Sequence, residues 1–300
     1  MHSRCTLLTL ALTALTLAFI LPLGSNMASE HPADAASASA VHEYDAAAAA
    51  ASRLPNDGPA PRSLSVLLLG ATGRTGLPFL SRALARGHRV TAVVRNASKL
   101  DASLTSNPLL TCIEASLDEG APNAQDRIDA AVGSAKPQVV VSMLASDPKP
   151  HNGVSNGARV VISALRAHPP AAPVPLIVIG GWGMAGPSEQ WVKQGSFANR
   201  MVGHLGSWFF GNIIQDFRKS YEMMAKAEGE GLIRSTKLQP PFLTNGPRTS
   251  TYQFGDAHLF KTMNAYATVS RNDLADAALR LTEQAAEGEK LPEFVAVKNA

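Results

Sequence analysis

The amino-acid sequence predicts an α/β fold in which a doubly wound, mainly parallel sheet is covered by helices on both faces. From residue 64 to the end, short apolar runs alternate with segments of helical periodicity, which is the pattern of successive βα units. The apolar run 66–69 leads through Gly70–Gly76 into a helical pattern, as a strand, a tight turn and a helix would. The later run 138–144 is almost continuously apolar, as expected for a strand buried on both faces. We therefore expect a single domain over residues 64–300, with about seven strands.

The first 63 residues have a different character. Residues 1–24 combine a short basic start with an apolar stretch, which predicts a signal peptide and therefore the secretory pathway. An uncleaved membrane anchor is the alternative, because the apolar stretch approaches the roughly 17 residues that span a bilayer. Translation from Met27 would instead leave the protein in the cytoplasm. Residues 25–63 are rich in alanine, serine, proline and aspartate, and we expect them to form a low-complexity linker.

The composition limits the classes of function. The 300-residue chain is 45% hydrophobic and 17% charged, which suffices for one well-packed core beyond the N-terminal extension. Its net charge of +3 is spread without a long basic run, so no nucleic-acid partner is expected. The two cysteines, Cys5 and Cys112, indicate neither a disulfide framework nor a metal site. Cys112 lies in an apolar run and is expected to be buried and unreactive.

The turn after the first strand carries the most specific motif of the chain. Its residues are Gly70, Ala71, Thr72, Gly73, Arg74, Thr75 and Gly76. Glycines at this spacing let backbone N–H groups and a helix N-terminus approach a pyrophosphate, which predicts a dinucleotide ligand. A strand-to-helix turn without a ligand is the alternative. The run Gly-Ala-Thr-Gly-Arg-Thr-Gly resembles the cofactor loop of the atypical short-chain dehydrogenase/reductases, the NmrA-like and biliverdin/flavin-reductase-like group, which implies a Rossmann-type fold that binds NAD(P).

The end of the second strand predicts which dinucleotide is bound. An apolar run over Val90–Val94 ends at Arg95, about twenty residues past the glycine loop, where enzymes that prefer NAD usually carry an acid. A cation there suits the 2′-phosphate of NADP, and Arg74 is a second candidate cation. Two solvated arginines are the alternative. Asn96-Ala97-Ser98 is a glycosylation sequon beside this site, and a glycan there would conflict with cofactor binding in the secretory pathway.

Further cofactor contacts are expected where the later strands end, because ligands of open α/β sheets lie beyond the carboxyl ends of the strands. Strands are predicted over 109–114, 138–144, 174–179, 231–238 and 294–297, and helices over 154–167 and 213–228. The family resemblance and these strand ends place near the cofactor Leu117, Asp118, Met143, Leu144, Ala145, Gly180, Gly181, Pro240 and Pro241. Gly87 is expected to end one helix, and Ser270 or Asn272 to cap the start of another.

An aromatic cluster follows the fifth strand. All tryptophans of the chain fall between residues 182 and 208. We predict that Trp182 and Trp208, together with Phe242, line an apolar substrate pocket beneath an aromatic flap. Ordinary hydrophobic packing or an oligomer contact is the alternative.

A catalytic pair is missing from the helix expected over 213–228. Short-chain dehydrogenases of the main type carry Tyr-x-x-x-Lys there, where the lysine lowers the tyrosine pKa. Tyr221 and Lys226 are one residue too far apart and fall on different helix faces, so we assign no catalytic residue. Through Asp216 and Glu222 the helix resembles that of the NmrA-like group.

The sequence as a whole favours an NADPH-dependent oxidoreductase that passes a hydride to a flat conjugated acceptor such as a flavin, quinone, tetrapyrrole or enone. Such chemistry needs an exposed nicotinamide and an apolar pocket but no Tyr-Lys pair. The alternative is a non-catalytic NADP sensor of NmrA-like type, which the missing pair favours. A nucleotide-sugar epimerase is less favoured, because it would ordinarily need the pair. The expected partner is a small molecule, with membrane association through the N-terminus if the anchor is retained.

Overall fold

The structure used here is a computed structural model that describes residues 62–118, 121, 123–145, 152–181, 211–256 and 267–299. All of these residues belong to one compact unit, Asn56–Ala300. The predicted signal peptide and nearly all of the predicted linker lie outside the described residues, so both stay predictions. Within the described ranges, no helix is long and apolar enough to cross a membrane.

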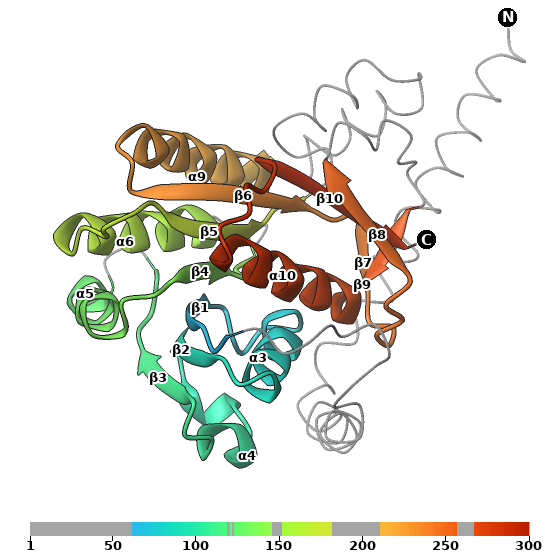
Figure 1. The fold of residues 1–300 in the computed structure, drawn as a ribbon, viewed down its shortest axis with the longest axis horizontal. Coiled ribbons are helices and arrows are strands. Elements are labelled where there is room, and N and C mark those ends of the chain that lie inside the picture. The colour runs from blue at the N-terminus through green and yellow to red at the C-terminus, as the bar shows by residue number, and fades with distance from the viewer. Residues whose placement is uncertain are drawn as a thin grey trace, which may run out of the picture. The chain divides into compact units, whose positions relative to one another are not determined.

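An eight-stranded sheet forms the centre of this unit, in the order β3-β2-β1-β4-β5-β6-β10-β8 (Figure 1). All neighbouring strands pair in parallel except β8, which runs antiparallel to β10 along one edge. The strands are β1 (Ser65–Leu69), β2 (Arg89–Val94), β3 (Leu110–Glu114), β4 (Val139–Ser142), β5 (Val174–Ile179), β6 (Ile233–Gln239), β8 (Tyr252–Asp256) and β10 (Phe294–Asn299). The predicted doubly wound, mainly parallel fold is therefore confirmed.

The expected number of strands is wrong, because the sequence analysis missed β8. An antiparallel edge strand has no need of a continuous apolar run, and Gly255 within β8 weakens its strand signal further. The analysis also missed a separate two-stranded parallel sheet made of β7 (Phe242–Thr244) and β9 (Thr268–Ser270). β7 comes shortly after β6, and β9 directly precedes α10.

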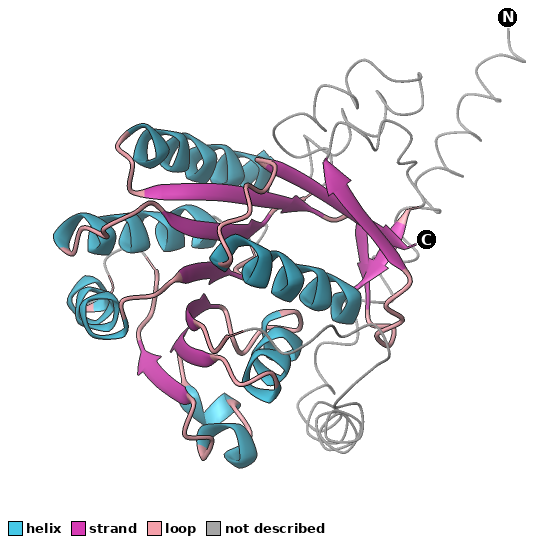
Figure 2. Cartoon of the chain, viewed as in Figure 1, coloured by secondary structure: helices cyan, strands magenta, loops and turns pink. Residues whose placement is uncertain are grey.

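Helices cover both faces of the main sheet (Figure 2). Alternate residues of β1 separate the two layers, since Val66 and Leu68 pack with α3 (Gly76–Ala85) and α10 (Arg271–Ala286). Leu67 and Leu69 pack instead with the helices of the opposite face. These helices are α5 (Ala124–Ala135), α6 (Gly153–Ala167) and α9 (Gly211–Gly229). Two short turns, η1 (Ala97–Lys99) and α4 (Ala102–Thr105), lie between β2 and β3.

The strand order reverses at β1, which lies between β2 and β4. Leu69 at the end of β1 is in register with Val93 on one side and Ser142 on the other. The connection after β1 passes over one face of the sheet through α3, and that before β4 passes over the other through α5. In doubly wound proteins, ligands bind at such a reversal point, beyond the carboxyl ends of the strands, which here are those of β1 and β4.

Two predicted helix boundaries are confirmed. Gly87 lies just beyond α3 with a φ of +82°, a left-handed conformation that glycine adopts without strain. Ser270 caps α10, because its hydroxyl accepts a hydrogen bond from the N–H of Asp273 at 2.9 Å. The side chain of Asn272 is used differently and donates to the carbonyl of Gly246.

Cys112 is half-buried, so the prediction that it is buried is wrong. It lies on β3, an edge strand that has a neighbour on one side only. Burial, and to a smaller extent the charge of Glu114, raises the pKa of the Cys112 thiol. A raised pKa leaves less reactive thiolate at neutral pH.

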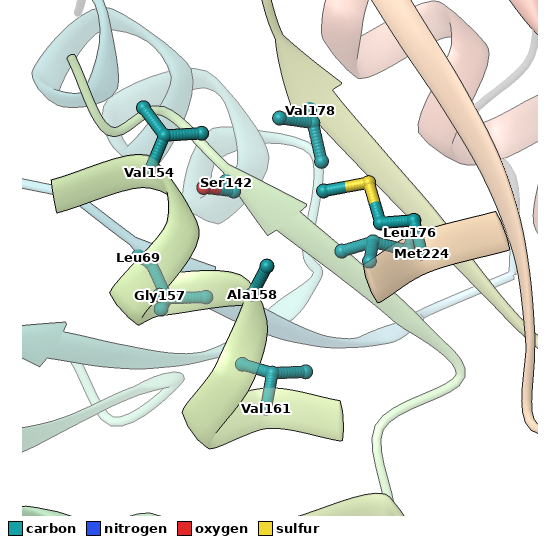
Figure 3. A pocket seen from close by; sticks show the side chains of 9 residues that line it. All are labelled: Leu69, Ser142, Val154, Gly157, Ala158, Val161, Leu176, Val178 and Met224. Carbon is teal, nitrogen blue, oxygen red and sulfur yellow. The ribbon is translucent and has the colours of Figure 1, made fainter. Parts of the chain in front are cut away.

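A narrow apolar gap lies between the sheet, α6 and α9 (Figure 3). Its lining is formed by Leu69, Ser142, Val154, Gly157, Ala158, Val161, Leu176, Val178 and Met224. The hydroxyl of Ser142 points into the gap and has no hydrogen-bond partner among the described residues. Because the gap has no room for a water molecule, it is a packing defect of the core and not a ligand site.

Candidate cofactor site

The glycine loop leads from β1 into α3. Close backbone contacts require glycine at two of its positions. Gly70 has a φ of +80°, and a Cβ on it would lie 2.9 Å from the carbonyl oxygen of Met143 at the end of β4. A Cβ on Gly76 would lie 2.0 Å from the carbonyl oxygen of Gly70. Both contacts are to backbone atoms that cannot move aside. Gly70 and Gly76 are therefore required by the close packing of the turn itself.

Gly73 faces open space. Its N–H donates to the carbonyl of Gly70 at 3.0 Å, which closes the turn. A Cβ on Gly73 would meet only that same carbonyl oxygen, at 3.2 Å. The free side of this residue leaves room for a ligand to approach the backbone closely.

The N-terminus of α3, which follows the loop, is open as well. Thr75 at the N-cap makes no side-chain capping bond, and the first turn contains no acidic residue. Leu77 donates its N–H to the carbonyl of Gly73 at 2.9 Å and Pro78 has no N–H, so the helix start offers an anion chiefly the positive potential of its dipole. A pyrophosphate has the charge and the acceptor oxygens that such a terminus binds, so the loop fits a dinucleotide.

The starts of two other helices in the same domain are closed by side chains. The buried carboxylate of Asp216 on α9 accepts the N–H of Val154 at 3.0 Å and that of Ser155 at 2.9 Å, both in the first turn of α6. The start of α10 is closed by Ser270. α5 also begins without a side-chain cap, but it carries Asp126 in its first turn, whereas α3 has neither a cap nor an acid, which favours an anionic ligand at the glycine loop.

Arg95 extends from the end of β2 and is exposed. The backbone that follows it is held by two side chains, since Asn96 accepts the N–H of Ser98 at 2.8 Å and Glu114 accepts the N–H of Ala97 at 2.7 Å. The carboxylate of Glu114 is thus occupied by the backbone, and no described residue forms an ion pair with Arg95. A cation without an acidic partner therefore lies where the adenosine ribose of a dinucleotide would be.

Arg271, the first residue of α10, lies near Arg74 of the glycine loop, and sequence analysis missed it. Its guanidinium donates to the side-chain oxygen of Asn245 at 2.6 Å. Partial burial, followed by the positive charge of Arg74, lowers the pKa of Arg271 to about 10. No short-range signal could reveal this proximity, because Ser270-Arg271-Asn272 reads only as a helix start.

The segments after β3 and β4 bring their predicted residues to the same edge. Asp118 folds back on Ser116, whose hydroxyl donates to its carboxylate at 2.7 Å. Leu117 and Leu144 both lie beside Gly157 of α6, which has no Cβ and so leaves space for the Leu144 side chain. Met143 is buried, with its N–H bonded to the carbonyl of Leu69, and Ala145 is exposed.

Gly180 follows β5, and the hydroxyl of Tyr221 explains why it is a glycine. A Cβ on Gly180 would lie 2.3 Å from that hydroxyl. The ring of Tyr221 also packs edge-on against Phe294, with 5.9 Å between the ring centroids, and Lys237 lies over both rings. Gly180 therefore has a packing role besides any contact with the cofactor. Gly181, the last described residue before a gap, is half-buried.

Lys237 is a buried lysine in the middle of β6, and the sequence analysis did not single it out. Its ammonium group reaches the carboxylate of Glu293 at 3.0 Å. The aromatic rings of Tyr221 and Phe294 cover the remaining side of that group, as in other cation–π contacts. The lysine of this site thus comes from a strand and packs on the ring, which is not the arrangement of a Tyr-x-x-x-Lys pair.

The stability of the fold should fall in alkali because of two buried tyrosines. Burial raises the pKa of Tyr221, and the Gln239 side chain partly opposes this shift. Burial, and to a smaller extent the negative charge of Asp276, raises the pKa of Tyr252. An unfolded tyrosine ionises near pH 10, so this stability is complete below about pH 10 and is lost above it, by about 1.4 kcal/mol per pH unit for each residue. Urea unfolding of the wild type and Tyr221→Phe across this range measures the slope. Equal slopes for the two proteins would contradict the assignment.

Beyond β6, two prolines precede Phe242. Among the described residues, Phe242 is the only large hydrophobic residue whose side chain is exposed. Pro240 is buried, Pro241 is half-buried, and Phe242 at the start of β7 is 48% exposed. The role of Phe242 in a substrate pocket stays a prediction. Trp182 and Trp208 lie outside the described residues, so their roles stay predictions. In the part of the chain that the structure describes, no group of acids, histidines and cysteines could hold a metal ion.

Comparison with known proteins agrees with this site. The model of a family described as NAD(P)H-binding matches residues 70–285, from the first glycine of the loop to the end of α10. YwnB, an uncharacterized protein of Bacillus subtilis, is 26% identical over 227 residues, which cover 72% of this chain and 91% of YwnB. The match confirms the resemblance that the glycine loop indicated.

Solved structures share the fold. A short-chain dehydrogenase/reductase of Veillonella parvula in complex with NADP is 18% identical with a TM-score of 0.56, covering 77% of this chain and 93% of that one. ChuY, an anaerobillin reductase of Escherichia coli O157:H7, is 18% identical with a TM-score of 0.55, covering 77% of this chain and 95% of that one. At these identities the likeness concerns the fold. The individual contact residues assigned above stay predictions.

Proposed function

Because the chain belongs to the NAD(P)H-binding family, we propose that it is an oxidoreductase that uses NADPH to reduce a flat, conjugated small molecule. The observation that carries the proposal is the α3 N-terminus without a side-chain cap together with Arg95, which forms no ion pair with a described residue; the two suit a pyrophosphate and a 2′-phosphate. No acid follows β2 at the position where the ribose hydroxyls of NAD would need one. The described site therefore favours NADPH over NADH.

The residues of this chain bind and orient, while the nicotinamide supplies the hydride when the cofactor is bound. Gly73 and the first turn of α3 would hold the pyrophosphate, and Arg95 would neutralise the 2′-phosphate. The nicotinamide half would lie toward the ends of β5 and β6, near Gly180 and Pro240. Tyr221 stays protonated and buried there, so the proton that follows the hydride would come from solvent or from the acceptor.

The class of acceptor is inferred from the nicotinamide side of the site. Phe242 presents an exposed ring at the end of β6, on which a flat conjugated molecule could stack. The anaerobillin reductase ChuY, which shares the fold, is a reductase by its name and supports the reaction class. Hydride transfer to such a molecule requires correct positioning more than acid catalysis.

Replacing Arg95 with glutamine should weaken NADPH and spare NADH. The guanidinium is expected to contact only the 2′-phosphate, and a hydrogen bond to a charged group contributes about 1.5–3 kcal/mol, or roughly tenfold to a hundredfold in affinity. Fluorescence titration of the variant with both cofactors measures the change. Equal weakening of the two would place Arg95 away from the 2′-phosphate.

The reaction itself is tested by following the loss of the absorbance of reduced nicotinamide, at about 340 nm, as NADPH is oxidised. The assay is repeated with a panel of flavins, quinones, tetrapyrroles and enones as acceptors. Turnover on one class of acceptor is expected. The alternative, a non-catalytic NADP sensor, is favoured by the buried position of Tyr221, which leaves the described part of the site without a tyrosine acid. Saturable NADPH binding without oxidation of any acceptor would select the sensor.

A further inference from the structure

We propose that Glu114 is a positioning residue for NADPH, because its carboxylate holds the turn that follows Arg95 and so aims that arginine at the 2′-phosphate. The inference rests on the cofactor site of the proposed function and adds to it a residue from a neighbouring strand. Glu114 itself would touch no part of the cofactor and would act through Arg95.

The pairing of β2 with β3 fixes the backbone that leads into Arg95. Glu114 is the last residue of β3 and lies in register with Val94, the last residue of β2. Figure 1 shows the two strands side by side at one edge of the sheet. The N–H of Ala115 donates to the carbonyl of Val94 at 2.9 Å, so the pairing continues past the end of both strands. Arg95 therefore begins from a backbone position that the sheet holds.

Two side chains fix the backbone that leads away from Arg95. Glu114 accepts the N–H of Ala97 at 2.7 Å, and Asn96 accepts the N–H of Ser98 at 2.8 Å. Both bonds engage the first N–H groups of η1, which a helix cannot satisfy from within. Of the two bonds, only that of Glu114 comes from another strand. It therefore determines where the turn lies relative to the sheet, and with it the direction in which Arg95 extends.

The same bond withholds an acid from two competing roles at this edge. A carboxylate that reached the ribose would accept its hydroxyls and favour NAD. A carboxylate that paired with Arg95 would neutralise the cation that the 2′-phosphate needs, and no described residue forms such a pair. The bond to Ala97 is charge-assisted, which makes it stronger than a bond between neutral groups.

The charge of Glu114 and its hydrogen bond act on NADPH in opposite directions. A negative charge beside a phosphate site weakens the binding of the phosphate by repulsion. The hydrogen bond strengthens binding, because it holds Arg95 in place before the cofactor arrives. Substitutions that remove one contribution or both can therefore separate them.

The test is a fluorescence titration of the full chain with NADPH and with NADH, for the wild type, Glu114→Ala and Glu114→Gln. Glu114→Ala removes the acceptor and the charge, and we expect its NADPH affinity to fall by about fivefold or more while its NADH affinity is kept. Glu114→Gln removes the charge but keeps an acceptor oxygen for the N–H of Ala97, so its NADPH affinity should equal or exceed that of the wild type. An effect of charge alone would make both variants bind NADPH more tightly.

A double variant shows whether Glu114 acts through Arg95. In an Arg95→Gln protein, adding Glu114→Ala should cause no further loss of NADPH affinity, because no guanidinium remains to be positioned. A general structural role of the turn would instead lower the affinity in both backgrounds.

Asp126→Ala is the matched control, because Asp126 is an exposed acid on α5 and the substitution removes the same charge. It should leave both affinities unchanged. Thermal unfolding should show that each variant remains folded.

Four results would overturn the inference. They are unchanged or tighter NADPH binding in Glu114→Ala, an equal loss of NADH affinity in that variant, a Glu114→Gln protein as weak as Glu114→Ala, and a further loss in the double variant. A wild type that binds NADH as tightly as NADPH would contradict the proposed cofactor preference together with the inference. A wild type that prefers NADPH, with a Glu114→Ala variant that prefers it equally, would contradict the inference alone.

Discussion

Replacing Gly76 with alanine should both unfold the glycine loop and abolish cofactor binding. The new Cβ would lie 2.0 Å from the carbonyl oxygen of Gly70, 2.8 Å from its carbonyl carbon and 3.1 Å from the Cα of Ala71. All three are backbone atoms, so α3 would have to move away from β1, against which it packs. Such overpacking belongs with the most damaging single substitutions, and we expect a loss of about 4 kcal/mol or more in the free energy of unfolding. Urea unfolding and NADPH titration measure the two effects.

Gly73→Ala is the matched control, and it should separate the two effects. Its Cβ would meet only the Gly70 carbonyl oxygen at 3.2 Å, so we expect the free energy of unfolding to change by less than about 1 kcal/mol. The methyl group would occupy the open side of the turn, however, and the pyrophosphate could no longer approach the backbone. NADPH affinity should therefore fall in a protein of nearly normal stability. A Gly73→Ala protein that binds NADPH normally would show that the ligand does not lie on this turn.

The second large effect is expected for Asp216→Ala on α9. The carboxylate is 1% exposed and accepts the N–H groups of Val154 and Ser155, so its removal leaves both donors in the first turn of α6 without a partner inside the protein. A carboxylate also stabilises a helix N-terminus through the helix dipole. Together these terms predict a loss of about 3 kcal/mol in the free energy of unfolding, measured in urea.

Two further variants separate the capping role of Asp216 from a general effect of acids on α9. Asp216→Asn keeps one acceptor oxygen and should lose about half as much stability as Asp216→Ala. Glu222 is exposed on the same helix, and Glu222→Ala should change stability by less than about 0.5 kcal/mol. Similar losses for Glu222→Ala and Asp216→Ala would contradict the capping role.

The regular part of the fold could be predicted from the sequence because its signals are local. Buried parallel strands are continuous apolar runs, and β5 was predicted with the bounds Val174–Ile179 that the structure shows. The glycine loop could be predicted equally well, because its close backbone contacts admit only glycine at positions 70 and 76. A glycine-rich turn of this kind predicts both the strand before it and the helix after it.

Features that depend on distant contacts could not be predicted. Among the described strands, β8 pairs only with β10, and the pKa of Arg271 is lowered in part by the charge of Arg74, which lies far from it in the sequence. Lys237 lies in a buried strand of mixed polar and apolar residues, and nothing in the sequence shows that Glu293 and two aromatic rings contact it. The packing role of Gly180 is of the same kind, since it depends on the hydroxyl of Tyr221.

The measurement that tests the account most directly is the affinity of the unmodified full chain for NADPH and for NADH under the same conditions. An α3 N-terminus without a side-chain cap, together with an Arg95 that pairs with no described acid, predicts saturable binding of both, with NADPH tighter by about tenfold or more. Equal affinities, or tighter binding of NADH, would contradict the assignment of Arg95 to a 2′-phosphate and with it the central claim that this chain works with NADPH.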